Sequence, residues 1–235
     1  EDLIIENYKA TESAGGIIGE LHCTIENLFI NNASINKTQS TNNKSQGILV
    51  DYNYGYIYNC GISNIEIIDN TTSNNSIIGG MIGSSSGGRV ENCYVQNIKM
   101  SIKNNFTYDG IGGLIGKCSS YTVILNSYVT GNIQSDASKI GGITGNFLGG
   151  IINQTYSAVD ISSEGDFIGG ICGYSSVSNQ NITNNISFGN LYTNVNTTYI
   201  DGIIGNNGET KNNYTFEGQT INGRFLYENS LTKEQ

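Results

Sequence analysis

The sequence predicts an all-β fold, a β-solenoid (parallel β-helix) of about seven coils with ~31 residues in each coil. Two observations lead to this prediction. A glycine-containing apolar string recurs at a near-constant interval along the 235 residues, and the segments between the strings alternate apolar and polar residues with a period of two. No segment combines a 3.6-residue apolar period with helix caps, so we expect strands and turns throughout.

The glycine string is the first mark of the repeat. It reads IGGMIG at 78–83 and IGGLIG at 111–116, and related strings occur before and after these two. The seven occurrences align on Gly16, Gly47, Gly80, Gly113, Gly142, Gly170 and Gly202, at intervals of 28 to 33 residues. The strings at Gly47 and Gly202 lack the doubled glycine, so they are the weakest members of the series.

An asparagine or glutamine is the second mark, 11 to 15 residues after each aligned glycine. Its occurrences are Asn27, Asn59, Asn92, Asn126, Gln154, Asn185 and Asn213. The distance from this residue to the next glycine varies more, so insertions are expected on that return side. The chain is therefore predicted to be a single repeat domain, 1–235, with repeats at about 14–45, 46–77, 78–110, 111–139, 140–167, 168–199 and 200–221 and a C-terminal tail at 222–235.

The segments at 90–102 and 122–133 are rich in Ile, Val and Tyr and alternate in polarity, which is typical of strands. A β-sandwich and a β-propeller are the alternative all-β folds. A propeller blade needs four strands and about 40 residues, which is more than each repeat supplies. The solenoid is the better interpretation, because each coil then buries its isoleucines against the coils on either side.

A glycine string followed by an Asn-Cys-Tyr-like strand resembles the GLUG motif. The units that carry the resemblance best are IGGMIGSSSGGRVENCYV at 78–95 and IGGLIGKCSSYTVILNSYV at 111–129. The resemblance covers roughly residues 14 to 216. It implies tandem repeats of a secreted or cell-surface protein, as in adhesins and immunoglobulin A-cleaving surface peptidases, where such repeats are accessory and not catalytic.

Composition excludes several function classes. The formal net charge is −9 with only 11 Lys and Arg, so a nucleic-acid partner is not expected. The longest apolar runs fall short of 18 residues, so we expect no transmembrane segment. The chain is instead predicted to be extracellular or at the cell surface.

The sequence predicts no catalytic, cofactor-binding or metal-binding residues. GIGGLIGKC at 110–118 departs from the phosphate-binding pattern at Ile111 and Cys118, and no helix is expected to follow it. Asp109 and Asp166 share an offset from their glycines but lie two repeats apart, too far for a carboxylate pair. His22 is the one histidine, which excludes a His-Glu-x-x-His site. The glycines are interpreted as turn elements that let one coil approach the next, through close contact or a positive φ.

Cys60 and Cys93 directly follow Asn59 and Asn92, so they are expected one rung apart. They form either a disulfide or, as we prefer, part of a buried column of small side chains. Eleven Asn-x-Ser/Thr sequons are candidate N-glycosylation sites if the chain is secreted by a eukaryote. They are Asn32, Asn36, Asn43, Asn70, Asn74, Asn105, Asn153, Asn181, Asn185, Asn196 and Asn213.

Tyr52, Tyr54, Tyr56 and Tyr58 alternate with other residues and are predicted to share one strand face, as an aromatic binding surface or as the cover of a half-buried face. The function favoured is a non-catalytic extracellular structural or adhesive repeat protein, including a subunit that associates head to tail into a fibre. The alternative is a carbohydrate-binding or carbohydrate-active β-helix module. A host molecule or glycan is the expected ligand in the adhesive case.

Overall fold

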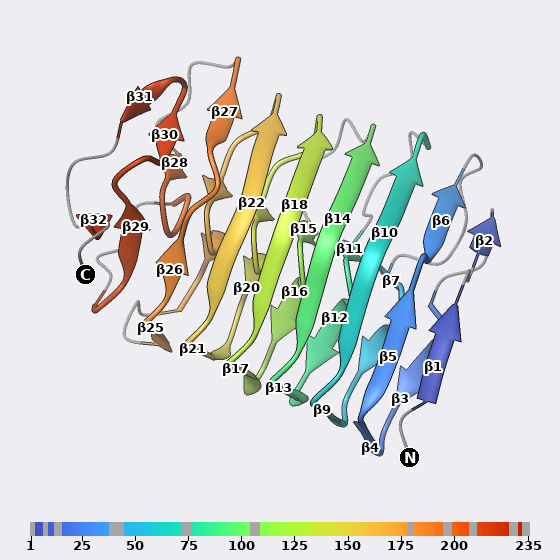
Figure 1. The fold of residues 1–235 in the computed structure, drawn as a ribbon. Helices are drawn as coiled ribbons and strands as arrows, with labels where there is room; N and C mark the ends of the chain where they lie inside the picture. The colour runs from blue at the N-terminus through green and yellow to red at the C-terminus, as the bar shows by residue number, and fades with distance from the viewer. Residues whose placement is uncertain are drawn as a thin grey trace.

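The structure, a computed structural model, describes residues 3–6, 9–11, 16–37, 45–71, 77–103, 109–177, 181–194, 199–206, 211–225 and 230–231. The chain winds into a β-solenoid of about six turns whose strands stack in four sheets (Figure 1). Neighbouring coils pair in parallel throughout, apart from one hairpin near the C-terminus. The predicted all-β solenoid is therefore confirmed.

Sheet A is the long wall of the solenoid and contains 14 strands. Its strands are β1 (Leu3–Glu6), β2 (Lys9–Thr11), β5 (Leu28–Asn31), β6 (Ser34–Lys37), β10 (Gly61–Asp69), β14 (Tyr94–Ile102), β18 (Tyr128–Ser135), β22 (Tyr156–Ser163), β26 (Ile186–Ser187), β27 (Leu191–Thr193), β29 (Tyr214–Phe216), β30 (Thr220–Ile221), β31 (Arg224–Phe225) and β32 (Ser230–Leu231). The four strands from β10 to β22 are the longest, so the middle of the wall is the most regular part.

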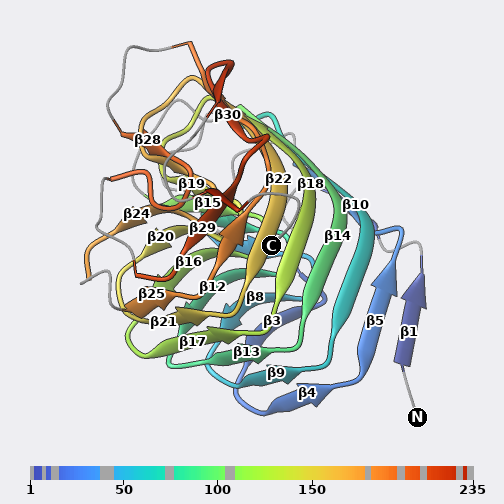
Figure 2. The ribbon, with the colours of Figure 1, turned by 60° about the vertical axis from the view of Figure 1, so that its left-hand side comes forward.

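Three shorter sheets of six strands complete each coil. Sheet B contains β3 (Ile18–Leu21), β8 (Val50–Asn53), β12 (Ile82–Ser86), β16 (Ile115–Ser119), β20 (Thr144–Phe147) and β24 (Cys172–Ser175). Sheet C contains β4 (Thr24–Glu26), β9 (Tyr56–Tyr58), β13 (Arg89–Glu91), β17 (Thr122–Leu125), β21 (Gly150–Asn153) and β25 (Ile182–Thr183). Sheet D contains β7 (Ser45–Gly47), β11 (Ile77–Gly79), β15 (Gly110–Gly112), β19 (Ile140–Gly141), β23 (Ile168–Gly169) and β28 (Ile200–Asp201). Each coil runs from D through B and C to A (Figure 2).

The doubled glycine forms the tight turn from sheet D into sheet B. A Cβ atom on Gly113 would lie 2.3 Å from the Gly142 carbonyl oxygen of the next coil and 2.7 Å from Val129 Cγ1 of sheet A. The φ angle of Gly113 is not among the positive ones, so close approach alone requires glycine here. The glycine string forms a turn between coils, as predicted. The positive φ angle that the prediction allowed for does not occur at Gly113.

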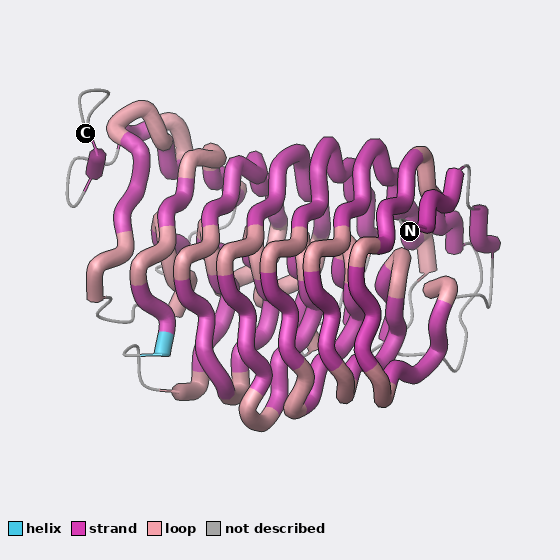
Figure 3. Tube along the Cα trace, turned by 60° about the horizontal axis from the view of Figure 1, so that its bottom comes forward, coloured by secondary structure: helices cyan, strands magenta, loops and turns pink. Residues whose placement is uncertain are grey.

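The structure corrects the repeat register at three places. Gly47 pairs with Gly79, so Gly47 corresponds to the first glycine of the string and Ile48 takes the place of Gly80. In the last two coils the left-handed corner residues are Asn184, with φ 59°, and Asn212, with φ 54°, and not the asparagines that follow them. Figure 3 shows these corners as a regular row of short loops between the strands.

A left-handed residue turns the chain from sheet C into sheet A in every coil. Asparagine favours this conformation because its short side chain bonds locally and tolerates positive φ. The residues at this corner are Asn27, Asn59, Asn92, Asn126, Gln154, Asn184 and Asn212, with φ between 46° and 59°. The second mark of the repeat therefore has a conformational cause.

The core is a set of isoleucine-rich columns that run along the solenoid axis. One column of sheet D contains Ile78, Ile111, Ile140 and Ile168, all at most 2% exposed. Burial of each such side chain contributes about 1.5 to 3 kcal/mol. No helix within the described ranges is long and apolar enough to cross a membrane.

Both ends of sheet A extend beyond the repeats. The strands β1 and β2 pair with β5 and β6, so the first residues add a partial coil before the first glycine string. At the other end β30 and β31 form an antiparallel hairpin, and β32 pairs with β29. In sheets B and C, by contrast, β3 and β4 are the terminal strands.

Candidate binding surface

The four predicted tyrosines do not share one strand face. The chain turns a corner at Tyr54 and Gly55, so Tyr52 lies on β8 of sheet B, whereas Tyr56 and Tyr58 lie on β9 of sheet C. A Cβ atom on Gly55 would lie only 2.0 Å from the Cys23 carbonyl oxygen, so the neighbouring coil fixes the corner there. The prediction of a single face is wrong because this corner interrupts the alternation.

All four rings still point toward the outside of the solenoid. Tyr54, Tyr56 and Tyr58 are 44%, 56% and 42% exposed. Tyr54 stacks on His22, with ring centroids 4.8 Å apart, and His22 Nε2 lies 3.3 Å from a Glu20 carboxylate oxygen. These rings therefore cover a convex corner and do not form a flat platform.

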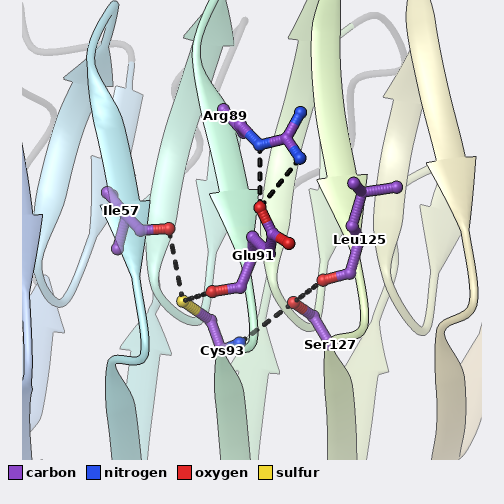
Figure 4. Close-up of polar contacts among 6 residues, drawn as sticks. All are labelled: Ile57, Arg89, Glu91, Cys93, Leu125 and Ser127. Atoms are coloured by element: carbon purple, nitrogen blue, oxygen red, sulfur yellow. Dashed lines mark hydrogen bonds and ion pairs between the residues drawn. The ribbon is translucent and has the colours of Figure 1, made fainter.

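An ion pair lies beside Tyr56 and Tyr58 on the outer face of sheet C. Arg89 Nη2 lies 2.8 Å from Glu91 Oε2, and these residues are the register partners of Tyr56 and Tyr58 (Figure 4). The two charges cancel within this pair. An exposed pair of this kind adds little stability.

The most continuous aromatic feature lies instead on the outer face of sheet A. Rings from six coils lie in one row along the axis, with centroid separations of 4.8 to 6.5 Å between neighbouring rings. This aromatic row consists of Phe29, Tyr94, Tyr128, Tyr156, Phe188 and Phe216. A row of this length is a rigid surface, because the rings stack in the offset and edge-on geometries that they prefer.

The aromatic row was not predicted from the sequence, although part of it follows a regular spacing. Phe29, Tyr94, Tyr128 and Tyr156 each lie two residues after the left-handed corner residue, while Gly61 occupies that position in the second coil. The Tyr94 ring covers Gly61, since a Cβ atom there would lie 2.1 Å from Tyr94 Cζ. The fixed offset identifies these four rings, whereas Phe188 and Phe216 lie four residues after Asn184 and Asn212.

The phenols in the middle of the row are partly desolvated. Burial, followed by the neighbouring Tyr156 and Tyr94, raises the pKa of Tyr128 above its ordinary value, and burial raises the pKa of Tyr156. Both hydroxyls therefore stay protonated well above neutral pH. They can donate hydrogen bonds while the rings offer apolar faces.

Polar side chains lie beside the row on the outer face of sheet A. Lys99 Nζ lies 3.0 Å from Glu66 Oε1, and the same column continues with Asn132 and Asp160 in the next two coils. Asn190 donates from its backbone nitrogen to Asp160 Oδ1 at 2.7 Å. This face therefore combines an aromatic row with amide and carboxylate groups.

Cys60 and Cys93 are free thiols buried at the corner between sheets C and A. The Cys93 thiol donates to the carbonyl oxygens of Glu91, at 3.2 Å, and Ile57, at 3.6 Å (Figure 4). The disulfide alternative is thus contradicted, and the preferred buried column is correct. We name this the corner column: Cys60, Cys93, Ser127, Thr155, Asn185 and Asn213, each immediately after a left-handed corner residue.

Polar members of the corner column link one coil to the next. Ser127 Oγ accepts a bond from the backbone nitrogen of Cys93 at 3.1 Å, and Asn185 Oδ1 accepts one from Thr155 N at 2.9 Å. Asn213 Oδ1 accepts in the same way from Asn185 N at 2.9 Å. The column therefore satisfies backbone groups that the left-handed turn leaves outside the sheet ladders.

The candidate glycosylation sites separate into four groups. Asn32, Asn36 and Asn70 are exposed, and Asn153 and Asn181 are half-buried. Asn185 and Asn213 are 0% and 5% exposed, so the folded chain withholds them from a glycosyltransferase, and these two predictions are corrected. Asn43, Asn74, Asn105 and Asn196 lie outside the described residues.

The acidic side chains in the described ranges do not gather into a cluster. Asp109 Oδ1 lies 3.8 Å from Lys117 Nζ, and Asp166 lies two coils further along. Within the part of the chain that the structure describes, no group of three or more His, Cys, Asp or Glu side chains could hold a metal ion.

Comparison with known proteins identifies a fold and no family. No family model matches the chain, and no curated protein matches it. A crystal structure of a candidate immunoglobulin A1 protease from Bacteroides ovatus is similar, with a TM-score of 0.63 and 18% sequence identity. The similarity covers 97% of this chain and 65% of that protein, so this chain spans less than two thirds of its length. The class shared by the two is the parallel β-solenoid.

Proposed function

We propose that this chain is a non-catalytic adhesive β-solenoid of an extracellular or cell-surface protein, and that it binds its target through the outer face of sheet A. The observation that carries the proposal is the aromatic row, which places rings from six coils on one rigid face. Stacked rings offer a large contact area at a small entropic cost, because the fold already orders them.

Two further observations support this role. The resemblance to GLUG repeats implies an accessory module of a surface protein. The similar B. ovatus protein is a candidate immunoglobulin A1 protease of which this chain spans 65%, so a solenoid of this kind can form part of a longer chain. We therefore assign the chain to target binding and assign no catalysis to it.

The test is adhesion of the purified chain to intact cells and to arrays of immobilised glycans and extracellular proteins. Phe188 is 37% exposed and Tyr156 is 38% exposed, so the double variant Tyr156→Ala/Phe188→Ala removes ring surface without emptying the core. We expect adhesion to fall at least tenfold with a cooperative unfolding transition retained. Tyr121→Ala is the control, since Tyr121 is 85% exposed and lies between sheets B and C. Equal adhesion of both variants would contradict the proposal.

Head-to-tail association is a second candidate, and the ends of sheets B and C favour it. The strands β3 and β4 end their sheets among the described residues, and terminal strands can pair with a further copy. Electron microscopy of the purified chain at rising concentration tests it. Filaments with a repeat equal to the solenoid length would support a fibre subunit, whereas a monomer at every concentration would exclude it.

A further inference from the structure

A shallow groove crosses the polar half of the outer face of sheet A, beside the aromatic row. Its volume is about 470 Å³, and it spans β18, β22 and the turn before β27. The side chains that line it are Asn132, Gln134, Asp160, Ser162, Asn190 and Tyr192. We propose that this groove is a binding subsite for an uncharged saccharide, an inference that rests on the proposed adhesive function.

The strand of the sixth coil is interrupted beside the groove. Between β26 and β27 the chain passes through Phe188, Gly189 and Asn190, opposite the continuous strand β22. A Cβ atom on Gly189 would lie 1.9 Å from the Val159 carbonyl oxygen, so glycine lets the chain dip toward its neighbour there.

A hydrogen-bond chain holds the groove floor in place. Asn190 donates from its backbone nitrogen and from Nδ2 to Asp160 Oδ1, at 2.7 and 3.3 Å. Asn190 Oδ1 in turn accepts from the backbone nitrogen and the hydroxyl of Thr220, both at 2.9 Å. The side chains of the floor are therefore oriented before any ligand arrives, which lowers the entropic cost of binding.

The donor and acceptor pattern matches a sugar. Both bonds to Asp160 use Oδ1, so within the described residues Oδ2 remains available as an acceptor for a hydroxyl group. Gln134, Asn132 and Ser162 can each donate and accept, as sugar hydroxyls do. Tyr192 is 52% exposed at one end of the groove and offers a ring face to the C–H groups of a pyranose.

Charge and backbone geometry exclude the main competing ligands. Asp160 is the one charged side chain of the lining, and the chain has a net charge of −9, so an anionic sugar would be repelled. An extended peptide would need an open strand edge, yet β22 pairs with β18 on one side and with β26 and β27 on the other. A neutral saccharide carries no charge that would be repelled and needs no open strand edge.

The test is saturation-transfer NMR and calorimetry with the full chain against neutral tetrasaccharides of glucose, mannose, galactose and N-acetylglucosamine, with a sialylated tetrasaccharide as the anionic probe. We expect one neutral class to bind and the anionic probe to bind at least tenfold more weakly. Tyr192→Ala should raise the Kd at least tenfold, whereas Tyr192→Phe should preserve binding. Asp160→Asn should raise the Kd severalfold, since the amide keeps an oxygen for Asn190 N but lacks the carboxylate's second acceptor.

The controls separate this inference from the proposed function. Tyr121→Ala should leave the Kd unchanged, and circular dichroism should report the same melting temperature for Tyr192→Ala and the parent chain. The inference is overturned if no neutral probe binds, if the sialylated probe binds best, or if Tyr192→Ala and Asp160→Asn bind as the parent does. Adhesion that is lost in Tyr156→Ala/Phe188→Ala but retained in Tyr192→Ala would leave the proposed function intact while removing the subsite.

Discussion

The glycine turn and the corner column are both repeated in every complete coil, but they tolerate different changes. At the turn, Gly80, Gly113, Gly142 and Gly170 occupy one position, and Ile48 replaces glycine there in the second coil. The corner column changes from thiol to hydroxyl to carboxamide along the axis. Space limits which residues fit at the turn, whereas hydrogen bonding limits which residues fit in the corner column.

The cause of the difference is what each position touches. A Cβ atom at the turn meets the backbone of the next coil, which cannot move without disturbing the stack. Most corner side chains instead donate to a carbonyl near the end of a sheet C strand. The Cys93 thiol donates to Glu91 O, the Ser127 hydroxyl to Leu125 O, and the Asn213 amide to Ile182 O. Several side chains can donate in this way, so the corner varies.

The largest effect is expected from filling the turn. Gly113→Val would place a branched side chain within 2.3 Å of Gly142 O and 2.7 Å of Val129 Cγ1, so one coil must shift away from the next. We expect a loss of about 3 kcal/mol or more in the free energy of unfolding. Urea denaturation followed by circular dichroism measures it.

The matched control is Gly19→Val on β3. A Cβ atom on Gly19 would meet nothing within 4 Å, so this change should alter stability by about 0.5 kcal/mol or less. If both variants unfold at the same urea concentration, close approach is not what keeps glycine at the turn.

The second effect concerns Asn185 in the corner column. Its Oδ1 accepts from Thr155 N and Oγ1, both at 2.9 Å, and its Nδ2 donates to Ile152 O at 3.2 Å. Asn185→Ala leaves these buried groups without partners, so we expect a loss of about 3 kcal/mol in the free energy of unfolding. Asn185→Thr, which copies Thr155, should recover part of it.

Asn184→Gly serves as the control for Asn185. It changes the neighbouring residue, which is exposed and has a φ of 59°, a conformation that glycine adopts readily. We expect its unfolding midpoint to stay close to that of the parent chain. A larger loss for Asn184→Gly than for Asn185→Ala would place the stabilising role at the corner residue instead of the column.

The repeat and its strands could be predicted because both follow from a period in the chain. The register could not be fixed in the last coils, since Asn184 and Asn185 both satisfy the second mark and only φ distinguishes them. The sheet corner at Gly55 was hidden by an unbroken alternation of tyrosines. Sequence shows the period of a solenoid, whereas corners depend on contacts between coils.

One buried feature carried no sequence signal. Lys37 and Asp69 are 1% and 0% exposed, and their Nζ and Oδ2 atoms lie 3.6 Å apart in adjacent coils. Asp69 Oδ1 also accepts a bond from Thr71 N at 2.9 Å. A charged residue in an alternating strand is normally assigned to the outer face, so a buried pair across coils becomes visible only once the coils are stacked.

Alkaline pH should lower the free energy of unfolding through two thiols that are buried in the core. Burial raises the pKa of Cys118 to about 12, with a smaller opposing contribution from Thr144, and burial also raises the pKa of Cys172. Above pH 9 the unfolded thiols lose protons while the folded ones keep them. The free energy of unfolding should therefore fall by about 1.4 kcal/mol per pH unit for each thiol until the folded pKa is reached.

The variant Cys118→Ala/Cys172→Ala isolates this contribution, because tyrosines and lysines titrate in the same range. We expect its urea midpoint to fall less between pH 8 and pH 10.5 than that of the parent chain. Cys23→Ala, which removes an exposed thiol, should follow the parent. Parallel curves for all three proteins would show that the buried thiols do not contribute.

The smallest effect is a gain, at a position where an apolar column ends in an amide. Gln46 pairs with Ile78 in sheet D and is 1% exposed, and neither polar atom of its side chain has a hydrogen-bond partner in the described part of the chain. Gln46→Ile would continue the column of Ile78, Ile111 and Ile140. We expect the free energy of unfolding to rise by about 1 kcal/mol, because a buried amide without partners is costly.

Gln219 provides the contrasting amide, because its polar nitrogen is engaged. It is 0% exposed, and its Nε2 donates to Gly189 O at 2.6 Å and Ser187 Oγ at 2.9 Å. Gln219→Ile should therefore destabilise the chain by about 1 to 3 kcal/mol, opposite in sign to Gln46→Ile. If both changes shift the urea midpoint in the same direction, hydrogen bonding does not decide which residues a solenoid column accepts, and volume alone must be considered.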